Sequence, residues 1–317
     1  MGWIERLLGR HLFVEVPATT ANLGAGYDCL GLALDILNQT ELEPLPDSDG
    51  RIELSVEGAG AGAIPADRSN RFVAALEMGL ARPGDPLPAG RGWSIRMRND
   101  VPAARGLGSS ATATVGGLVA ANALLGWVLN ARDLLAMAAE LEQHADNAAA
   151  ALLGGFVVVD GNSGAPAALR FDAPEQLRCV LFIPDRDMPT DAMRACLPET
   201  VPLADAATNL GRVALGVAGL SQGHLAVLDR LTRDTLHEPY RARLYPELPI
   251  LVAAAREAGA LGACLSGAGS TVIAFTDSLG EADAIAVAMA TAAEEAGLAG
   301  AIRLAGVRNE PARVEVR

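Results

Sequence analysis

A strand, a proline, a glycine- and serine-rich stretch and a helix of small residues follow one another between residues 93 and 125. Residues 93–98 alternate apolar with polar side chains, which is typical of a half-buried strand. After Pro102 comes the stretch Gly106–Ala111 (GLGSSA), and small residues then predict a helix from about Ser110 to Leu125. Any fold of this chain has to pack helices against strands around this loop, which indicates mixed α and β structure.

The glycine-rich stretch is well suited to bind phosphate. Glycines let the backbone approach a ligand closely, and the first amides of a helix lack intrahelical partners at the positive end of the helix dipole. Such a helix start binds phosphate without any side-chain cation. The hydroxyls of Ser109 and Ser110 lie where a Mg²⁺ ion that bridges phosphates could be bound.

Two other interpretations of this stretch stay open at this point. Gly106 to Ala111 also matches the G-x-G-x-x-A pattern of dinucleotide-binding folds. Against it, residues 99–105 separate the strand from the first glycine, and Asp133, the acid near the expected distance, stands at a predicted helix start. The stretch could also be a helix start that serines cap without any ligand.

All 25 basic residues of the chain are arginines, and the sequence contains no lysine. A Walker A loop needs a lysine on the phosphates, and pyridoxal-phosphate enzymes and Schiff-base aldolases need a lysine amine. These classes are therefore excluded. A chain of this composition that binds ATP needs a device such as the helix start after Gly108.

Length, charge and cysteine content limit the organisation and the partners of the chain. A chain of 317 residues corresponds to about two domains. The net charge of −13 is spread along the sequence, which argues against nucleic acid or an anionic membrane as a partner. No Cys-x-x-Cys pair occurs, Met1–Arg10 does not resemble a signal peptide, and apolar runs are too short for a membrane span, so we expect a cytoplasmic protein with free thiols.

Strand-like and helix-like segments alternate through both halves of the chain. A strand is predicted over Leu12–Val16 and is expected to end at Pro17. Residues 160–166, rich in Gly, Pro and Asn, mark a candidate boundary between domains 1–162 and 163–317. The pattern predicts an α+β fold in two halves rather than a regular βαβ series.

Four stretches resemble, in the same order, the motifs of the GHMP kinases and, among these, of the homoserine kinases. Residues 102–111 resemble P-x-x-x-G-L-G-S-S-A, and residues 16–28 resemble V-P-A-T-S-A-N-L-G-P-G-F-D, with Tyr27 in place of the phenylalanine. Residues 143–155 resemble G-H-x-D-N-x-A-x-A-L-L-G-G, and residues 265–271 resemble the Gly-rich C-terminal motif. Single motifs arise by chance, whereas an ordered set is specific.

The resemblance implies a fold and a reaction. The fold is a two-domain GHMP kinase architecture, with an N-terminal domain like domain 2 of ribosomal protein S5 and a C-terminal ferredoxin-like domain. In the reaction, ATP phosphorylates the side-chain hydroxyl of L-homoserine to O-phospho-L-homoserine, on the route to threonine. The alternatives are a mevalonate- or sugar-type kinase of the superfamily, an NAD(P)-dependent oxidoreductase, and a sensor without turnover. Whether the chain forms a homodimer stays open.

The resemblance also assigns site residues. For ATP these are Pro102, Arg105, Gly106, Leu107, Gly108, Ser109, Ser110, Ala111, Gly267 and Gly269. For Mg²⁺ they are Ser110 and Glu142, with Glu140 as the alternative to Glu142. For homoserine they are Asn22, Asp28, His144, Asn147, Thr190, Arg194 and Arg241, and of these Asn22, Asn147 and Arg194 are also assigned to catalysis.

The chemistry of these residues agrees with an amino-acid substrate. Asp28 supplies the anion that an ammonium group needs, and the planar guanidinium groups of Arg194 and Arg241 suit a carboxylate. Sugars carry neither group. We assign no general base, and Asp146 is the minor candidate for one.

Overall fold

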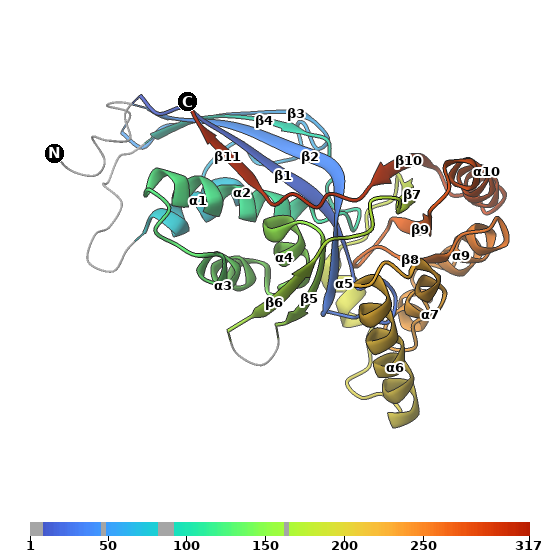
Figure 1. The fold of residues 1–317 in the computed structure, drawn as a ribbon. Helices are drawn as coiled ribbons and strands as arrows, with labels where there is room; N and C mark the ends of the chain where they lie inside the picture. The colour runs from blue at the N-terminus through green and yellow to red at the C-terminus, as the bar shows by residue number, and fades with distance from the viewer. Residues whose placement is uncertain (1–8, 46–48, 82–91, 162–164) are drawn as a thin grey trace.

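The computed structural model describes residues 9–45, 49–81, 92–161 and 165–317. They form two β-sheets with helices packed against them, the larger mostly on the left of Figure 1 and the smaller on the right. No helix in these ranges is both long and apolar enough to cross a membrane. Most of the N-terminal segment interpreted above (residues 1–8) and part of the predicted boundary (residues 162–164) lie outside the described residues.

The larger sheet has seven strands. Its main path is β11-β1-β2-β4-β3, and β5 and β6 extend it from β2. The strands are β1 (Leu12–Ala21), β2 (Leu30–Leu45), β3 (Ile52–Gly58), β4 (Gly92–Asn99), β5 (Phe156–Asp160), β6 (Ala167–Phe171) and β11 (Arg313–Val316). The helices that lie beneath strands β1 to β4 in Figure 1 are α1 (Arg71–Leu80), α2 (Ser109–Leu124), α3 (Ala131–Glu142) and α4 (Asp146–Leu153).

The smaller sheet has four antiparallel strands in the order β10-β7-β9-β8. Numbered along the chain this order is 4-1-3-2, the arrangement of a ferredoxin-like domain. The strands are β7 (Arg178–Pro184), β8 (Gly262–Leu265), β9 (Val272–Thr276) and β10 (Gly300–Gly306), and the crossing helices are α9 (Leu248–Glu257) and α10 (Leu279–Glu295). Between β7 and α9 lie α5 (Thr190–Ala195), α6 (Leu203–Leu220), a 3₁₀ turn (Leu225–Val227), α7 (Leu228–Leu231) and α8 (Glu238–Arg241).

The chain passes between the two sheets more than once. β6 and β11 both follow residue 163, yet β6 pairs with β5 and β11 pairs with β1 in the larger sheet. The C-terminal strand thus returns to the sheet that the N-terminal strand begins. We keep 1–162 and 163–317 as a proposal for the two domains, with these two strands as exchanged elements.

The predicted end of the first strand at Pro17 is wrong. β1 continues to Ala21, and its pairing with β2 shifts register between Pro17 and Ala18. Proline cannot donate a ladder hydrogen bond, and sheets accommodate it at such irregularities. The longer strand matters for the site because it leads directly to Asn22.

The close packing of α1 on α2 depends on small residues in α2. A Cβ atom at Gly117 would stand 2.3 Å from the carbonyl oxygen of Phe72 in α1. Phe72, Leu76 and Leu118 are buried in the same core beneath the sheet. This packing fixes α2, and with it the loop that precedes Gly108.

Gly117→Ala is expected to lower the free energy of unfolding by about 1–3 kcal/mol, because the added methyl group overlaps the backbone of α1. Gly211→Ala in α6 is the matched control, since nothing lies within 4 Å of its Cβ position. In that exposed helix, alanine is expected to raise the free energy of unfolding by about 0.5–1 kcal/mol. Urea unfolding measures both, and equal effects would contradict the close contact of α1 with α2.

Candidate active site

Three loops from distant parts of the sequence meet in the structure. They are residues 22–28 after β1, residues 100–108 before α2, and residues 266–271 between β8 and β9. Ser266 links two of them, because its Oγ lies 2.7 Å from the carbonyl oxygen of Gly106. The loops of the two sheets therefore form one shared site.

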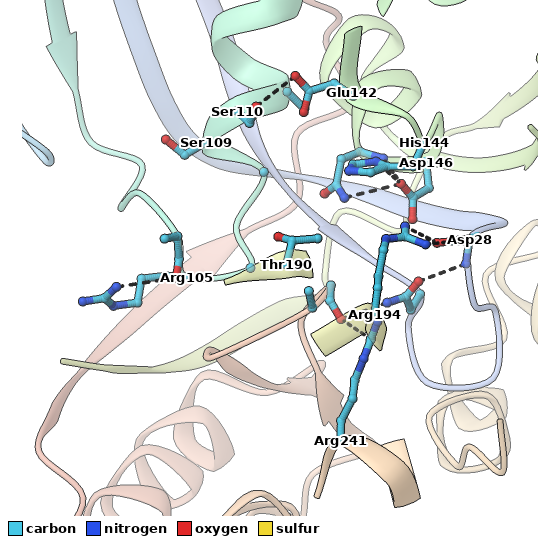
Figure 2. Close-up of a pocket in the computed structure, with 18 residues that line it drawn as sticks. Asp28, Arg105, Ser109, Ser110, Glu142, His144, Asp146, Thr190, Arg194 and Arg241 are labelled. Atoms are coloured by element: carbon cyan, nitrogen blue, oxygen red, sulfur yellow. Dashed lines mark hydrogen bonds and ion pairs between the residues drawn. The ribbon is translucent and has the colours of Figure 1, made fainter. Parts of the chain in front are cut away.

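The three loops line an open cleft with a volume of about 120 Å³ (Figure 2). Helices α2, α3, α5 and α8 and the start of α4 contribute the remaining walls. The predicted site residues that line it are Asn22, Asp28, Arg105, Gly106, Gly108, Ser109, Ser110, Ala111, Glu142, His144, Asn147, Thr190, Arg194, Arg241 and Gly267.

The start of α2 offers unpaired amides to the cleft. Gly108 precedes the helix in the left-handed conformation, with φ of 70°, and has no capping side chain. The amide of Thr112 donates to the Gly108 carbonyl oxygen at 2.8 Å. Within the described ranges, the amides of Ser109, Ser110 and Ala111 donate to no protein acceptor. This helix start keeps the hydrogen-bonding capacity that an anion needs.

Position 108 requires glycine for two reasons. Its φ is unfavourable for other residues, and a Cβ atom there would stand 2.0 Å from Oγ1 of Thr19. The Thr19 hydroxyl in turn donates to Oδ1 of Asn147 at 2.7 Å. A side chain at position 108 would therefore disturb both β1 and the start of α4.

Three oxygen-bearing side chains gather beside the free amides. Ser110 Oγ donates to Oε1 of Glu142 at 2.9 Å, and Thr114 Oγ1 donates to the same oxygen at 2.5 Å. The Glu142 side chain is 3% exposed and lies 3.7 Å from Nε of Arg71. In the part of the chain that the structure describes, no group of three His, Cys, Asp or Glu side chains could hold a metal by itself. One carboxylate with hydroxyls still suits Mg²⁺, which takes most of its ligands from phosphates and water.

At the other end of the cleft, Asp28 and Arg194 pair with each other (Figure 2). Arg194 Nη1 donates to Asp28 Oδ2 at 2.9 Å, and Nη2 donates to Oδ1 at 2.8 Å. Nη1 also lies 2.9 Å from the Tyr27 hydroxyl oxygen. The bonds to Asp28 raise the pKa of the Arg194 guanidinium. An amino acid that binds here would have to divide this pair, with its ammonium on Asp28 and its carboxylate on Arg194.

Arg241 is almost fully buried beside this pair, with 1% of its surface exposed. Its Nε donates to the carbonyl oxygen of Met193 at 3.2 Å, and Nη1 donates to that of Gly267 at 3.0 Å. Within the described ranges, no carboxylate lies within ion-pair distance of it, and burial lowers its pKa. A buried cation met by neutral acceptors is suited to receive an anion.

A polar cluster at the start of α4 lies between the two ends of the cleft (Figure 2). Nδ1 of His144 lies 3.1 Å from Oδ1 of Asp146, which also accepts the amide of Asn147 at 2.7 Å. Burial lowers the pKa of His144, but the carboxylates of Asp146 and Glu142 outweigh it, so the net pKa is raised. His144 and Asn147 are thus held by the buried Asp146.

Three residues assigned to ATP do not line the cleft: Pro102, Leu107 and Gly269. The Leu107 side chain is fully buried in the hydrophobic core, and its carbonyl oxygen accepts the Thr19 amide at 3.1 Å. A motif records such packing residues together with the ligand contacts. Glu140 is exposed outside the cleft, whereas Glu142 lines it.

Arg105 lines the cleft, but its guanidinium binds the protein. Nε donates to the carbonyl oxygen of Pro184 at 2.6 Å, and Nη2 donates to that of Asp185 at 2.9 Å. It also forms an ion pair with Asp187. The side chain therefore fastens the loop before α2 to the end of β7.

Sequence reasoning missed Tyr27, Thr114 and His237 as parts of the site. Tyr27 lies in a quoted motif, but only the structure shows its contact with Arg194. Thr114 lies four residues after Ser110 on α2, a helical spacing that could have indicated it. His237 lies four residues before Arg241, and this spacing was the available signal.

Gly108→Ala is expected to weaken ATP binding by about 100-fold, because the side chain displaces the loop and turns the free amides away. Gly126→Ala is the matched control, since Gly126 also has positive φ, +81°, but nothing lies within 4 Å of its Cβ position. The control variant has the strain of an alanine at positive φ, but its methyl group meets no neighbouring atom, unlike that of Gly108→Ala. Isothermal titration calorimetry with ATP, with the melting temperature of each variant, separates the two effects. Unchanged affinity in Gly108→Ala would show that the loop is only structural.

Comparisons with known proteins agree with this geometry. Residues 70–155 match the GHMP kinases N terminal domain, and residues 217–295 match GHMP kinases C terminal. The homoserine kinase of Moorella thermoacetica is 42% identical over 265 residues, which cover 83% of this chain and 86% of that one. The homoserine kinase of Parasynechococcus marenigrum is 39% identical over 294 residues and covers 92% of both chains.

A solved structure is similar over nearly the whole chain. The crystal structure of homoserine kinase from Cytophaga hutchinsonii superposes with a TM-score of 0.85, at 30% identity, over 96% of this chain and 97% of that one. The predicted two-domain GHMP kinase fold is thereby confirmed. With the matching domains and the relatives at about 40% identity, this chain belongs to the homoserine kinase family of the GHMP kinases.

Proposed function

We propose that this protein transfers the γ-phosphoryl group of ATP to the side-chain hydroxyl of L-homoserine, giving O-phospho-L-homoserine for threonine synthesis. One observation carries the proposal: a single cleft has free helix amides at one end and the Asp28–Arg194 pair at the other. The first end suits a triphosphate, and the second suits an amino acid. An acceptor held at the second end would direct its hydroxyl toward the γ-phosphate of ATP held at the first.

The phosphate end would work through the backbone and one metal ion. Amides of Ser109, Ser110 and Ala111 are available to the β- and γ-phosphates. Ser110 and Glu142 are the residues that would hold Mg²⁺, and this ion would supply charge neutralisation on the phosphates. Thr114 keeps the Glu142 carboxylate turned toward Ser110.

The amino-acid end would work through exchange of ion-pair partners. Asp28 would accept the substrate ammonium, while Arg194 and Arg241 would hold its carboxylate. Asn22 supports Asp28, because its Oδ1 accepts the Asp28 amide at 3.0 Å. The substrate brings one charge of each sign, so the exchange leaves the net charge of the pocket unchanged.

Phosphoryl transfer itself asks mainly for positioning. In a loose transition state the attacking hydroxyl carries little charge early, so a strong base is not required. We therefore assign Asn22, Asn147 and Arg194 to positioning the reacting groups, with His144 and Thr190 as further contacts to homoserine. Asp146 is buried and already accepts the Asn147 amide and the His144 ring, so it is a weak candidate for a general base.

The alternative functions lack support at one end of the cleft or the other. A sugar acceptor has no ammonium or carboxylate group to exchange with the Asp28–Arg194 pair. In the dinucleotide interpretation Asp133 should bind a ribose, but it forms a capping box with Asn130 at the start of α3. The kinase proposal uses both ends.

The test is a turnover assay with a panel of acceptors. The protein is incubated with Mg²⁺-ATP and homoserine, mevalonate or galactose, and ADP release is measured. Release with homoserine alone supports the proposal. Release with mevalonate or galactose and not with homoserine would contradict it, and nucleotide binding without ADP release from any acceptor would indicate a sensor.

Two further expectations concern the cellular location and the oligomeric state of the protein. Cys29, Cys179, Cys196 and Cys264 are free thiols, which agrees with a cytoplasmic enzyme. Light scattering on the purified protein measures whether a homodimer forms.

Arg241→Ala is expected to raise KM for homoserine by about 100-fold and to leave KM for ATP within about twofold, because the carboxylate contact is lost while the free amides of α2 lie at the other end of the cleft. Arg243→Ala is the matched control, since Arg243 lies two residues away and is exposed. Steady-state kinetics with each substrate varied in turn measures both constants. A larger effect on ATP than on homoserine would refute the carboxylate role.

Glu142→Gln is expected to raise the Mg²⁺ concentration for half-maximal activity by about tenfold or more, because the amide replaces the anionic ligand. Glu140→Gln, on the same helix but exposed, should leave it unchanged. Activity is measured against Mg²⁺ at constant ATP. The reverse pattern would move the metal to Glu140.

A further inference from the structure

His237 lies behind the amino-acid end of the cleft and is completely buried. Its Nδ1 lies 3.0 Å from Nη1 of Arg241, and its Nε2 lies 2.8 Å from the carbonyl oxygen of Gly24. Gly24 belongs to the loop that ends at Asp28. One imidazole ring therefore touches both the carboxylate-binding arginine and the loop of the ammonium-binding aspartate.

The partners of the ring fix its protonation state. A guanidinium group has only donors, so Nδ1 of His237 has to be an unprotonated acceptor. The carbonyl oxygen of Gly24 has only lone pairs, so Nε2 has to carry the proton and donate it. Burial lowers the pKa of His237 to about 4, while Asp234 opposes the shift and Arg241 adds to it. The ring is thus the neutral Nε2–H tautomer.

The donors of Arg241 can be counted in the same way. Its Nε hydrogen points to Met193, and the two Nη1 hydrogens point to Gly267 and to His237. Within the described ranges Nη2 has no protein acceptor, although Arg241 lines the cleft. His237 accepts the second Nη1 hydrogen and so helps to fix the orientation of the guanidinium group. The Nη2 hydrogens are left for a ligand.

The backbone around the ring is also held. Oδ2 of Asp234 accepts the amides of His237 and Glu238, both at 2.7 Å. The ring of Tyr27 packs against the imidazole at 5.3 Å between centroids. A Cβ atom at Gly24 would stand 2.6 Å from the backbone of Thr232, so the loop cannot shift toward α7. The backbone and the ring of His237 are therefore both held in place.

We propose that His237 is a positioning residue for substrate recognition: as a neutral bridge from Gly24 to Arg241, it sets the separation between the groups that bind the ammonium and the carboxylate of the acceptor. The inference rests on the proposed function, because it needs an amino-acid acceptor. It predicts that loss of His237 weakens the use of acceptors that carry both an ammonium and a carboxylate much more than the use of acceptors that carry the ammonium alone.

The test compares His237→Leu, which removes both hydrogen bonds, with His237→Asn, whose Oδ1 can replace the acceptor Nδ1. In His237→Leu we expect KM for homoserine to rise by about 10- to 100-fold, with KM for ATP unchanged. His237→Asn should recover most of the loss. With 3-aminopropan-1-ol, which is homoserine without its carboxylate, kcat/KM in His237→Leu should fall much less than it does with homoserine.

The outcomes separate this inference from the proposed function. If the wild type releases no ADP with homoserine, the proposed function fails whatever the variants do. If the wild type is active and folded His237→Leu keeps its KM for homoserine, or loses affinity for homoserine and ATP alike, the positioning role is overturned. If His237→Leu does not fold, His237→Asn decides alone. Positioning predicts a rise in KM for homoserine that is larger than the rise for 3-aminopropan-1-ol, and an equal rise with both acceptors contradicts it.

Discussion

The unpaired amides at the start of α2 are the feature on which the rest of the site depends. Without lysine, the chain has no ammonium side chain to place on a triphosphate. The Arg105 guanidinium, the nearest cation in the loop, is bound by carbonyl oxygens of Pro184 and Asp185. We therefore propose that phosphate is recognised by the amides of Ser109, Ser110 and Ala111, which have no protein acceptor in the described ranges and follow the left-handed Gly108.

The acceptor end is built on paired opposite charges, which in the proposed function a zwitterionic substrate would separate. Asp28 and Arg194 form a bidentate pair, and Arg241 is buried nearby without a carboxylate in the described ranges. Gly267, in the loop between β8 and β9, links two elements of the acceptor end, because its carbonyl oxygen accepts from both Asn22 and Arg241. Motifs distant in sequence therefore form one site, because hydrogen bonds join their loops.

The residues that line the cleft could be predicted from the sequence, whereas most of the contacts between them could not. The glycines and serines around Gly108 have few other uses at a helix start, and alternation predicted the strand before them. The predicted strand end at Pro17 was wrong, because the preference of proline for strand ends does not take account of an irregularity in the pairing. The register shift between Pro17 and Ala18 lets β1 continue past the proline. The bond between Asp28 and Arg194 joins residues 166 positions apart, and no local pattern indicates it. The pairing of β11 with β1 could not be predicted for the same reason, since these strands lie at opposite ends of the chain.

The most direct test is a crystal structure of the protein with a non-hydrolysable ATP analogue and Mg²⁺. The account predicts β- or γ-phosphate oxygens within about 2.7–3.2 Å of the amide nitrogens of Ser109, Ser110 or Ala111, with Gly108 still left-handed. Phosphates bound elsewhere, or arginine side chains in place of these amides, would contradict it.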